Sequence, residues 1–245
     1  MRRYGLIGYP LEHSFSQRYF TDKFQREGIL DACFDLYPIE HAASVQTIFQ
    51  TVADLQGLAV TIPHKTTVIP FLDGLEESAQ AIGAVNGIRK IEGRWVGFNS
   101  DYLGFEKTLL PHLKSHHDRA LILGTGGAAK AVAFVLDRLH IPHQFVSRNP
   151  TSAQLSYSEL DSYCLQAHRL IVQCTPIGMH PNHDASPLKN YTGIGSQHVL
   201  YDLIYNPEET IFLQTGKKVG ATVVNGLGML HAQAEVNWRK WNGLY

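Results

Sequence analysis

The chain has 245 residues, of which 44% are hydrophobic and 18% charged, and its formal net charge is −1. This composition is typical of a folded globular protein, and it excludes the strong basic charge with which proteins hold a nucleic acid backbone. No apolar run reaches the roughly 18 residues of a membrane span, and the N-terminal run turns polar at His13, too early for a secretory signal. We therefore expect a cytoplasmic protein that binds a small molecule and neither nucleic acid nor membrane.

The cysteines and histidines form no metal-binding pattern. The three cysteines, Cys33, Cys164 and Cys174, are far apart and contain no C-x-x-C pair, which argues against a disulfide framework and a zinc ribbon. His180 and His183 fall in a Pro- and Asn-containing loop rather than at the i, i+4 spacing of a helical metal pair. We expect reduced thiols and no metal.

Short β-like runs alternate with longer helix-like stretches along the whole chain, which predicts an α/β fold with parallel sheets. The predicted strands are residues 4–8, 33–37, 57–60, 84–91 with 95–98, 120–123, 143–147, 170–173, 198–202 and 222–224. So many strands favour two domains over one sheet.

The domain boundary is expected near residue 101. The polar, Pro-containing stretch 110–118 precedes a new strand, and the residues after Asn99 already indicate a connecting helix. The predicted domains are an N-terminal α/β domain (1–101), a nucleotide-binding domain (102–226), and a C-terminal helix (227–245) that packs back on the first domain. In that helix Leu230, Ala234 and Trp238 recur at helical spacing.

A glycine loop between a strand and a helix predicts a nucleotide site. Residues 120–132 read A-L-I-L-G-T-G-G-A-A-K-A-V, which matches G-x-G-x-x-A, and a helix is expected over 128–139. The glycines permit a tight turn and close approach of the main chain to a pyrophosphate, and the helix N-terminus directs N–H groups at it. The predicted contacts are Gly124, Thr125, Gly126, Gly127 and Ala128. The alternative is a glycine turn without a ligand.

The residues that end the second strand of this unit favour NADP over NAD. Ser147, Arg148 and Asn149 stand where NAD sites usually have an acidic residue for the ribose, and no carboxylate follows until Glu159. The planar guanidinium of Arg148 matches a 2′-phosphate, with hydrogen bonds from Ser147 and Asn149. The alternative for Arg148 is a solvated surface arginine.

Seven further segments, in order, resemble the signature motifs of the shikimate dehydrogenase family: residues 8–17, 57–65, 82–86, 97–104, 174–179, 201–207 and 225–234. The resemblance covers essentially the whole chain. The sequence departs from the family pattern at Gln17 (usually Pro), Ala59 (usually Asn), Gly87 (commonly Thr) and Ser100 (usually Thr). Ser100 keeps the hydroxyl, whereas Ala59 loses an amide near the expected crevice.

This resemblance implies a substrate-binding α/β domain followed by a Rossmann-type NADP-binding domain, and reversible reduction of 3-dehydroshikimate to shikimate by NADPH in aromatic amino-acid biosynthesis. It implies Lys65 and Asp101 as the catalytic pair. The implied substrate contacts are Ser14, Ser16 and Tyr205 for the carboxylate, and Thr61, Asn86, Asp101 and Gln233, with Lys65, for the ring hydroxyls. Gly226, Gly228 and Met229 are the implied contacts beside the nicotinamide.

Several of these residues have ordinary structural alternatives. Ser14 and Ser16 suit helix caps, Asn86 suits a turn, and Met229 suits a core. Two other functions stay open: a quinate/shikimate dehydrogenase that prefers NAD, and a non-catalytic nucleotide-sensing module. The sequence is compatible with a monomer or a homodimer.

Overall fold

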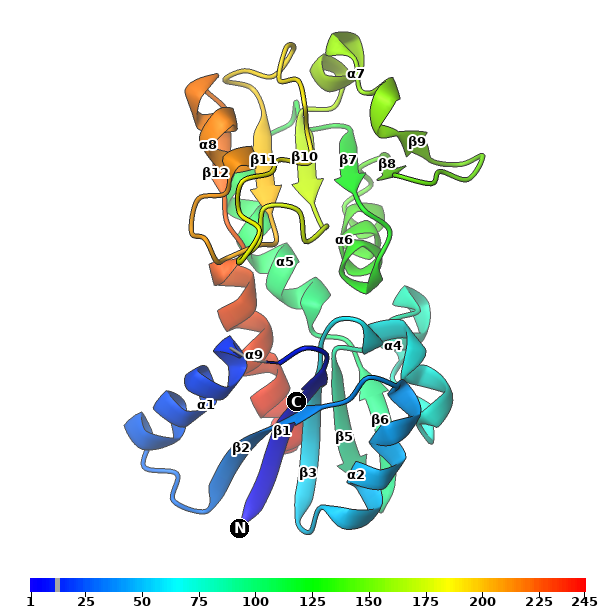
Figure 1. Cartoon of the computed structure of the whole chain (residues 1–245), viewed down its shortest axis with the longest axis vertical. Coiled ribbons are helices and arrows are strands. Elements are labelled where there is room, and N and C mark those ends of the chain that lie inside the picture. Colours follow the sequence, from blue (N-terminus) through cyan, green and yellow to red (C-terminus); the bar gives the residue numbers. More distant parts are fainter. Residues whose placement is uncertain (12–13) are drawn as a thin grey trace. The chain divides into compact units, whose positions relative to one another are not determined.

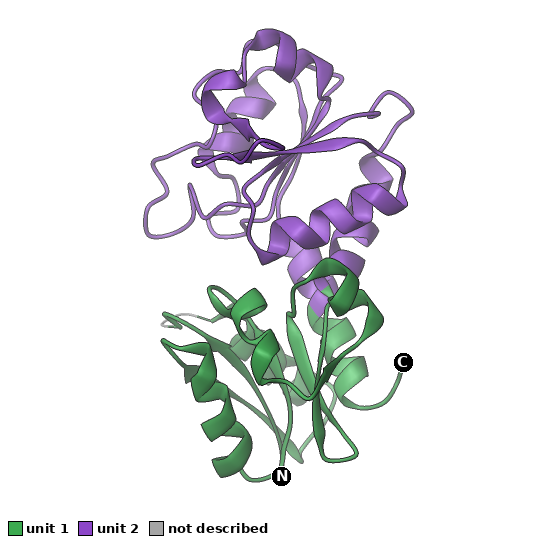
Figure 2. Ribbon diagram, turned by 90° about the vertical axis from the view of Figure 1, so that its right-hand side faces the viewer, with its two compact units in different colours: residues 1–100, 234–245 green, residues 101–233 purple. Residues whose placement is uncertain are grey.

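The computed structural model describes residues 1–11 and 14–245; Glu12 and His13 of the 8–17 motif lie outside the described residues. The chain forms two compact units, one of residues 1–100 and 234–245, the other of residues 101–233 (Figure 2). The sequence placed the whole of 227–245 with the first domain. In the structure the units divide within helix α9 (Leu227–Trp241), between Gln233 and Ala234.

The first unit is built on a six-stranded mixed sheet in the order β2-β1-β3-β5-β6-β4, counted over the described residues. Its strands are β1 (Arg2–Gly8), β2 (Ala32–Pro38), β3 (Leu55–Val60), β4 (Gly74–Leu75), β5 (Gly87–Ile91) and β6 (Arg94–Phe98). β1 runs parallel to β2 and β3, but β5 is antiparallel to β3 and β6. The predicted parallel pairing is present for β1 with β2 and β3 and for β4 with β6, and it is wrong for β5. A turn at Glu92 and Gly93, both with positive φ, joins β5 and β6 as a hairpin.

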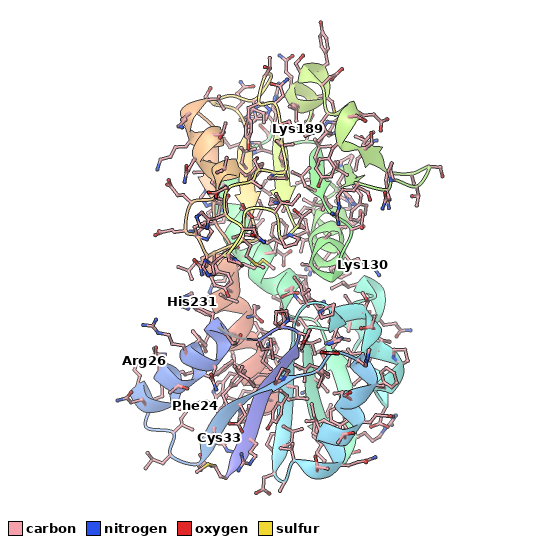
Figure 3. All side chains as sticks on the ribbon, in the orientation of Figure 1. Phe24, Arg26, Cys33, Lys130, Lys189 and His231 are labelled. Carbon is pink, nitrogen blue, oxygen red and sulfur yellow. The ribbon has the colours of Figure 1, made fainter. Side chains whose placement is uncertain are left out.

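Helices cover both faces of this sheet (Figure 1): α1 (Phe15–Arg26), α2 (Val45–Thr51), α3 (His64–Thr67), α4 (Glu77–Ile82) and the 3-10 turns Ala42–Ser44 and Ile69–Phe71. One face packs with α2 and α4. The other carries an aromatic cluster from β1, α1 and α9, in which Tyr4, Phe20, Phe24, Trp238 and Trp241 contact one another (Phe24 is labelled in Figure 3). The C-terminal half of α9 belongs to this unit because its tryptophans complete that cluster.

The second unit contains a parallel six-stranded sheet, in the part of the chain that the structure describes, in the order β12-β11-β10-β7-β8-β9. Its strands are β7 (Ala120–Leu123), β8 (His143–Ser147), β9 (Leu155–Ser156), β10 (Leu170–Gln173), β11 (Val199–Asp202) and β12 (Thr222–Val224). The expected parallel α/β arrangement is therefore present in this unit.

The central strands β7, β10 and β11 are buried along their whole length, which explains their mostly apolar sequences. Side chains of one set pack under α5 (Asp101–Leu109), α6 (Gly127–Arg138) and the first turns of α9; the alternate set packs under α7 (Ser162–Ala167) and α8 (Ile211–Lys218). Two 3-10 turns, Leu110–His112 and Tyr157–Glu159, complete the unit. Successive strand residues thus serve two cores, as the alternation of a β-strand requires.

Predicted and observed bounds agree in the second unit and diverge most around residue 84. The strands over 120–123, 143–147, 170–173 and 222–224 have the predicted bounds, whereas the C-terminal helix, predicted over 227–245, ends at Trp241. The strand predicted from residue 84 begins at Gly87, because the main chain of Ala84 and Val85 bonds to groups outside the sheet. The two-residue strands β4 and β9 were not predicted, since two residues carry no alternation pattern.

Candidate active site

Two predicted substrate serines lie where the chain leaves β1 and enters α1. Ser14 is the N-cap of α1, and its Oγ accepts a hydrogen bond from the main-chain N of Gln17 at 3.4 Å. Ser16 lies in the first turn, and both side chains are half-buried. Ser14 therefore has the structural role that was its alternative. A hydroxyl that accepts one bond can still donate its own proton, so capping does not exclude a ligand.

Thr61 and Lys65 follow the carboxyl end of β3, the strand next to β1. The main-chain N of Thr61 donates to Ile7 O at 2.9 Å, and Thr61 O accepts from the N of His64 at 2.9 Å, which closes a turn into α3. Lys65 is half-buried in this four-residue helix. So short a helix has little stability of its own. Contacts with the sheet must hold it in place.

One such contact comes from His64, which the sequence did not single out. The ring is 2% exposed, and its Nε2 lies 2.6 Å from Ile39 O, just after β2. A second contact is main-chain: Val85 N donates to Lys65 O at 2.7 Å. The segment that carries Lys65 is thus attached to the sheet on two sides.

Asn86 is buried and fully engaged with the segment that precedes α5. Its Oδ1 accepts from the main-chain N of Ser100 at 2.6 Å, and its Nδ2 donates to Ser100 Oγ at 2.8 Å. The neighbouring Asn99 Nδ2 donates to Ala84 O at 2.9 Å. Residues 84–86 therefore bond both to the Lys65 segment and to the two residues before Asp101. We call residues 84–86 the polar platform.

Asp101 is the first residue of α5, in the second unit, and is 4% exposed. Within that unit α5 and α9 approach closely at Gly104, where a Cβ would lie 2.7 Å from Met229 O and 3.3 Å from the N of Gln233. Gln233 is half-buried, and its Nε2 donates to Leu230 O at 3.0 Å. Asp101 and Gln233 therefore lie on two helices that pack against each other.

The glycine loop of the second unit has a geometry that suits a dinucleotide. Gly124 has φ +109°, a left-handed conformation that other residues rarely adopt, and its N donates to Val146 O at 2.9 Å. Gly126 is the N-cap of the 12-residue helix α6, and no atom lies within 4 Å of where its Cβ would be. Thr125 and Gly126 are exposed. The exposed helix N-terminus can accept a phosphate, so these residues fit a dinucleotide.

Three other residues of the predicted cofactor loop form the start of α6 and its support. Gly127 and Ala128 are its first residues and are half-buried, and Ala129 is buried against the sheet. Lys130, in the same turn, is exposed (Figure 3). The alanines let the helix pack closely on β7, as the fingerprint requires.

Arg148 and Asn149 extend from the end of β8 into solvent, and Ser147 Oγ accepts from the N of Asn149 at 3.2 Å. Nearby, the buried hydroxyl of Tyr157 has no hydrogen-bond partner among residues 1–11 and 14–245, and burial raises its pKa. An exposed arginine at this position is compatible both with a 2′-phosphate contact and with a solvated side chain.

The loop after β11 carries Tyr205 and is held by a buried carboxyl group. Asp202 is 0% exposed; its Oδ2 accepts from Thr210 Oγ1 at 2.6 Å and its Oδ1 from Ile204 N at 3.0 Å. Burial raises the pKa of Asp202 to about 7. Burial also raises the pKa of Tyr205, which keeps its hydroxyl protonated and able to donate.

The implied nicotinamide contacts lie at the start of α9. Gly226 N donates to Ile204 O at 3.0 Å, and a Cβ at this position would clash with Leu203 O, so the absence of a side chain has a packing reason. Gly228 is exposed in the first turn of the helix. The Met229 side chain is 7% exposed and belongs to the core under α5 and α6. Met229 has the structural role that was its alternative.

Sequence reasoning missed three buried polar residues that support the site: His64, Asp202 and Asn237 of α9. Asn237 is 1% exposed, and its Oδ1 accepts from Ser100 Oγ at 2.6 Å. A polar residue on the apolar face of a predicted helix was a usable signal, because buried polar groups need partners. The identity of the partner, 137 residues away, was not available from the pattern.

No helix in residues 1–11 and 14–245 is long and apolar enough to cross a membrane. Over the same residues no group of three or more His, Cys, Asp or Glu side chains has the arrangement of a metal site.

Comparison with known proteins covers nearly the whole chain. The sequence-family model of the shikimate dehydrogenase substrate binding domain matches residues 6–88 of this chain. A shikimate dehydrogenase (NADP(+)) from Geobacillus kaustophilus is 37% identical over 257 residues, covering 98% of this chain and 92% of the relative. One from Methanocaldococcus jannaschii is 36% identical over 265 residues, covering 98% and 91%.

A solved structure gives the same result for the fold. Shikimate 5-dehydrogenase from Thermus thermophilus, in complex with NADP(H) and shikimate, superposes with a TM-score of 0.87 at 30% identity, covering 100% of this chain and 94% of that one. The predicted fold class and family are confirmed. The chain belongs to the shikimate dehydrogenase family.

Proposed function

We propose that this protein catalyses the reversible NADPH-dependent reduction of 3-dehydroshikimate to shikimate, with Lys65 and Asp101 as its catalytic residues. The predicted activity, an NADP-dependent oxidoreductase of the shikimate pathway, and the predicted cofactor agree with the relatives of this chain and are confirmed. The observation that carries the residue assignment is the polar platform, which bonds to the Lys65 carbonyl and to both residues before Asp101.

The reduction requires a proton for the ketone oxygen as well as a hydride for its carbon. When bound, NADPH supplies the hydride. The Lys65 ammonium donates the proton and polarises the carbonyl group, and in the reverse direction the amine accepts the proton from the hydroxyl. We assign Asp101 the role of orienting the proton donor, which a carboxylate can perform by charge-assisted hydrogen bonding.

The remaining predicted polar residues are assigned to substrate recognition. Ser14, Ser16 and Tyr205 hold the carboxylate, since all three carry a hydroxyl that can donate. The ring hydroxyls form hydrogen bonds with Thr61, Asn86, Asp101 and Gln233 together with Lys65. A site that hydrogen-bonds each hydroxyl discriminates strongly, because a wrong ligand leaves buried groups unpaired.

The proposed cofactor contacts all belong to the second unit. The main chain of residues 124–128 holds the pyrophosphate at the N-terminus of α6. Ser147, Arg148 and Asn149 hold the 2′-phosphate. Gly226, Gly228 and Met229 contact the nicotinamide; because the Met229 side chain is buried in the core, its contact is a main-chain one. We also assign the protein to the cytoplasm, as a monomer or homodimer.

A spectrophotometric assay of shikimate and quinate, each with NADP and NAD, tests this function. We expect efficient oxidation of shikimate with NADP and much weaker turnover in the other three combinations. Preference for NAD or quinate would favour a quinate/shikimate dehydrogenase. NADP binding without any turnover would favour a non-catalytic nucleotide-sensing module and would contradict the proposal.

A further inference from the structure

We propose that Asn237 is a positioning residue of the active site: acting through the Ser100 hydroxyl, its carboxamide fixes the orientation of the Asn86 amide and the entry of the chain into α5 at Asp101. The inference rests on the proposed function, because Asn86 and Asp101 matter only if they serve the substrate.

Short hydrogen bonds connect the three residues within the first unit. Ser100 Oγ lies 2.6 Å from Asn237 Oδ1 and 2.8 Å from Asn86 Nδ2, and the main-chain N of Ser100 lies 2.6 Å from Asn86 Oδ1. All three residues are at most 2% exposed. These bonds are therefore shielded from water, which cannot replace a lost partner cheaply.

The number of protons on each group determines the donor and the acceptor in each of these hydrogen bonds. The Ser100 N–H can only donate, so the atom of Asn86 that faces it is the oxygen, and the amide nitrogen faces Ser100 Oγ. Ser100 Oγ accepts the amide proton and must direct its single hydroxyl proton elsewhere. Asn86 Oδ1 is 3.2 Å away and already accepts from Ser100 N, whereas Asn237 Oδ1 is 2.6 Å away. The proton therefore points to Asn237.

Removal of the Asn237 oxygen would release this proton. Asn86 Oδ1 lies 3.2 Å from Ser100 Oγ. Rotation of the hydroxyl toward this oxygen, which the Ser100 N–H now uses, would turn the lone pairs of Ser100 Oγ away from Asn86 Nδ2. The amide would lose a fixed acceptor for its nitrogen. Asn237 thus controls the direction of a bond in which it does not itself take part.

Contacts with the sheet hold the part of α9 that carries Asn237. The next residue, Trp238, packs its ring edge-on against Tyr4 of β1, with the ring centroids 5.2 Å apart. One turn further, Trp241 Nε1 donates to Ile88 O at 3.0 Å in β5. These contacts anchor this part of the helix to the sheet, so the amide is held at a fixed place beside Ser100.

The consequence reaches both proposed catalytic residues through the polar platform. Ser100 precedes Asp101 by one peptide bond, and Asn86 follows Val85, whose N donates to Lys65 O at 2.7 Å. A change in the Asn86–Ser100 bonds therefore shifts the segments that carry Lys65 and Asp101. The NADP-binding residues of the glycine loop belong to the other unit, so we expect this change to leave them unaffected.

The test is Asn237→Leu, which removes the acceptor at nearly constant size. We expect kcat/KM for shikimate to fall about tenfold, as for loss of one buried hydrogen bond, with a raised KM for shikimate, a shifted pH profile of kcat and unchanged NADP affinity. Arg239→Leu, at an exposed position of the same helix, is the matched control and should behave as wild type.

Ser100→Ala and Ser100→Thr provide an independent test if Asn237→Leu folds poorly. The alanine variant should reproduce the raised shikimate KM, the threonine variant should restore it because the hydroxyl returns, and the double variant Ser100→Ala/Asn237→Leu should lose little more than either single one. A shikimate KM and pH profile equal to wild type in Asn237→Leu or Ser100→Ala would overturn this inference alone. A wild-type protein that does not turn over shikimate would overturn the proposed function and, with it, this inference.

Discussion

The polar platform of the first unit and the glycine loop of the second obtain their geometry in different ways, the platform from side-chain hydrogen bonds and the loop from the main-chain conformation. In the glycine loop the main chain supplies the geometry: Gly124 has φ +109°, and Gly126 opens α6 with no atom within 4 Å of its Cβ position. In the platform, buried side chains supply it, since Asn86 and Asn99 bond to groups on neighbouring segments.

This difference has a consequence for tolerance to substitution. A site made by the main chain depends on backbone shape, and most side chains around it can change. A site made by buried side chains depends on each polar group, because every loss leaves a partner unsatisfied. We therefore expect substitutions of buried polar residues to act strongly in the polar platform. At the cofactor site we expect strong effects only at glycines and charged groups.

The largest expected effect is that of Lys65→Ala. Loss of the proton donor should lower turnover by about 10²- to 10⁴-fold, while NADP affinity stays unchanged because the phosphates are assigned to the other unit. Steady-state kinetics and NADP titration measure the two quantities. Lys90→Ala, an exposed lysine of β5, is the control. Near-wild-type turnover of Lys65→Ala would remove Lys65 from the catalytic residues.

The next effect is that of Arg148→Ala, which tests whether a charged group matters in the main-chain site. NADPH should bind about 10- to 100-fold more weakly, because a charge-assisted contact to the 2′-phosphate is lost. NADH lacks that phosphate and serves as the internal control. Equal weakening of both cofactors would show that Arg148 supports the loop and does not read the phosphate.

A smaller effect concerns the stability of the second unit through Asp202. Its folded-state pKa is about 7, against an ordinary 3.8. Between these values the unfolded chain releases the proton and the folded chain keeps it, so stability is highest at low pH and falls as pH rises toward 7. The loss is at most about 1.4 kcal/mol per pH unit.

Asp202→Asn removes this titration. Urea unfolding at pH 5, 6, 7 and 8 should show the wild type losing about 1 to 2 kcal/mol relative to the variant between pH 5 and 7, with no further divergence well above pH 7. Parallel pH dependences of wild type and variant would mean that Asp202 is ionised in the folded protein throughout this range.

The smallest expected effect is that of Gly126→Ala, which should change NADP affinity without changing the stability of the fold. The added Cβ meets no atom within 4 Å and the residue has φ −74°, so the melting temperature should not change. NADP affinity should fall about tenfold if a phosphate approaches this main chain. Gly124→Ala is the contrasting variant, and it should lower the melting temperature because φ is +109°. Unchanged NADP affinity in Gly126→Ala would move the phosphate away from Gly126.

Local sequence patterns were sufficient to predict most strands of the second unit and its glycine loop. Strands buried on both faces of a parallel sheet give continuous apolar runs with sharp ends, as in β7 and β10, which have the predicted bounds. The partly exposed strands β8 and β12 also have the predicted bounds. A phosphate loop is also local, since consecutive residues provide both the turn and the helix start. Family motifs then supplied Lys65, Asp101 and the substrate contacts as separate residues.

The hydrogen bonds by which the first unit holds Lys65 and the substrate contacts became known only from the tertiary structure. The antiparallel direction of β5 depends on a turn at Glu92 and Gly93 and on its pairing with β3, a strand far earlier in the chain. The bond between Ser100 and Asn237 joins residues 137 positions apart, and neither residue type indicates its partner. Local patterns specify periodicity and turns, whereas the pairing of buried polar groups is determined only when distant segments pack together.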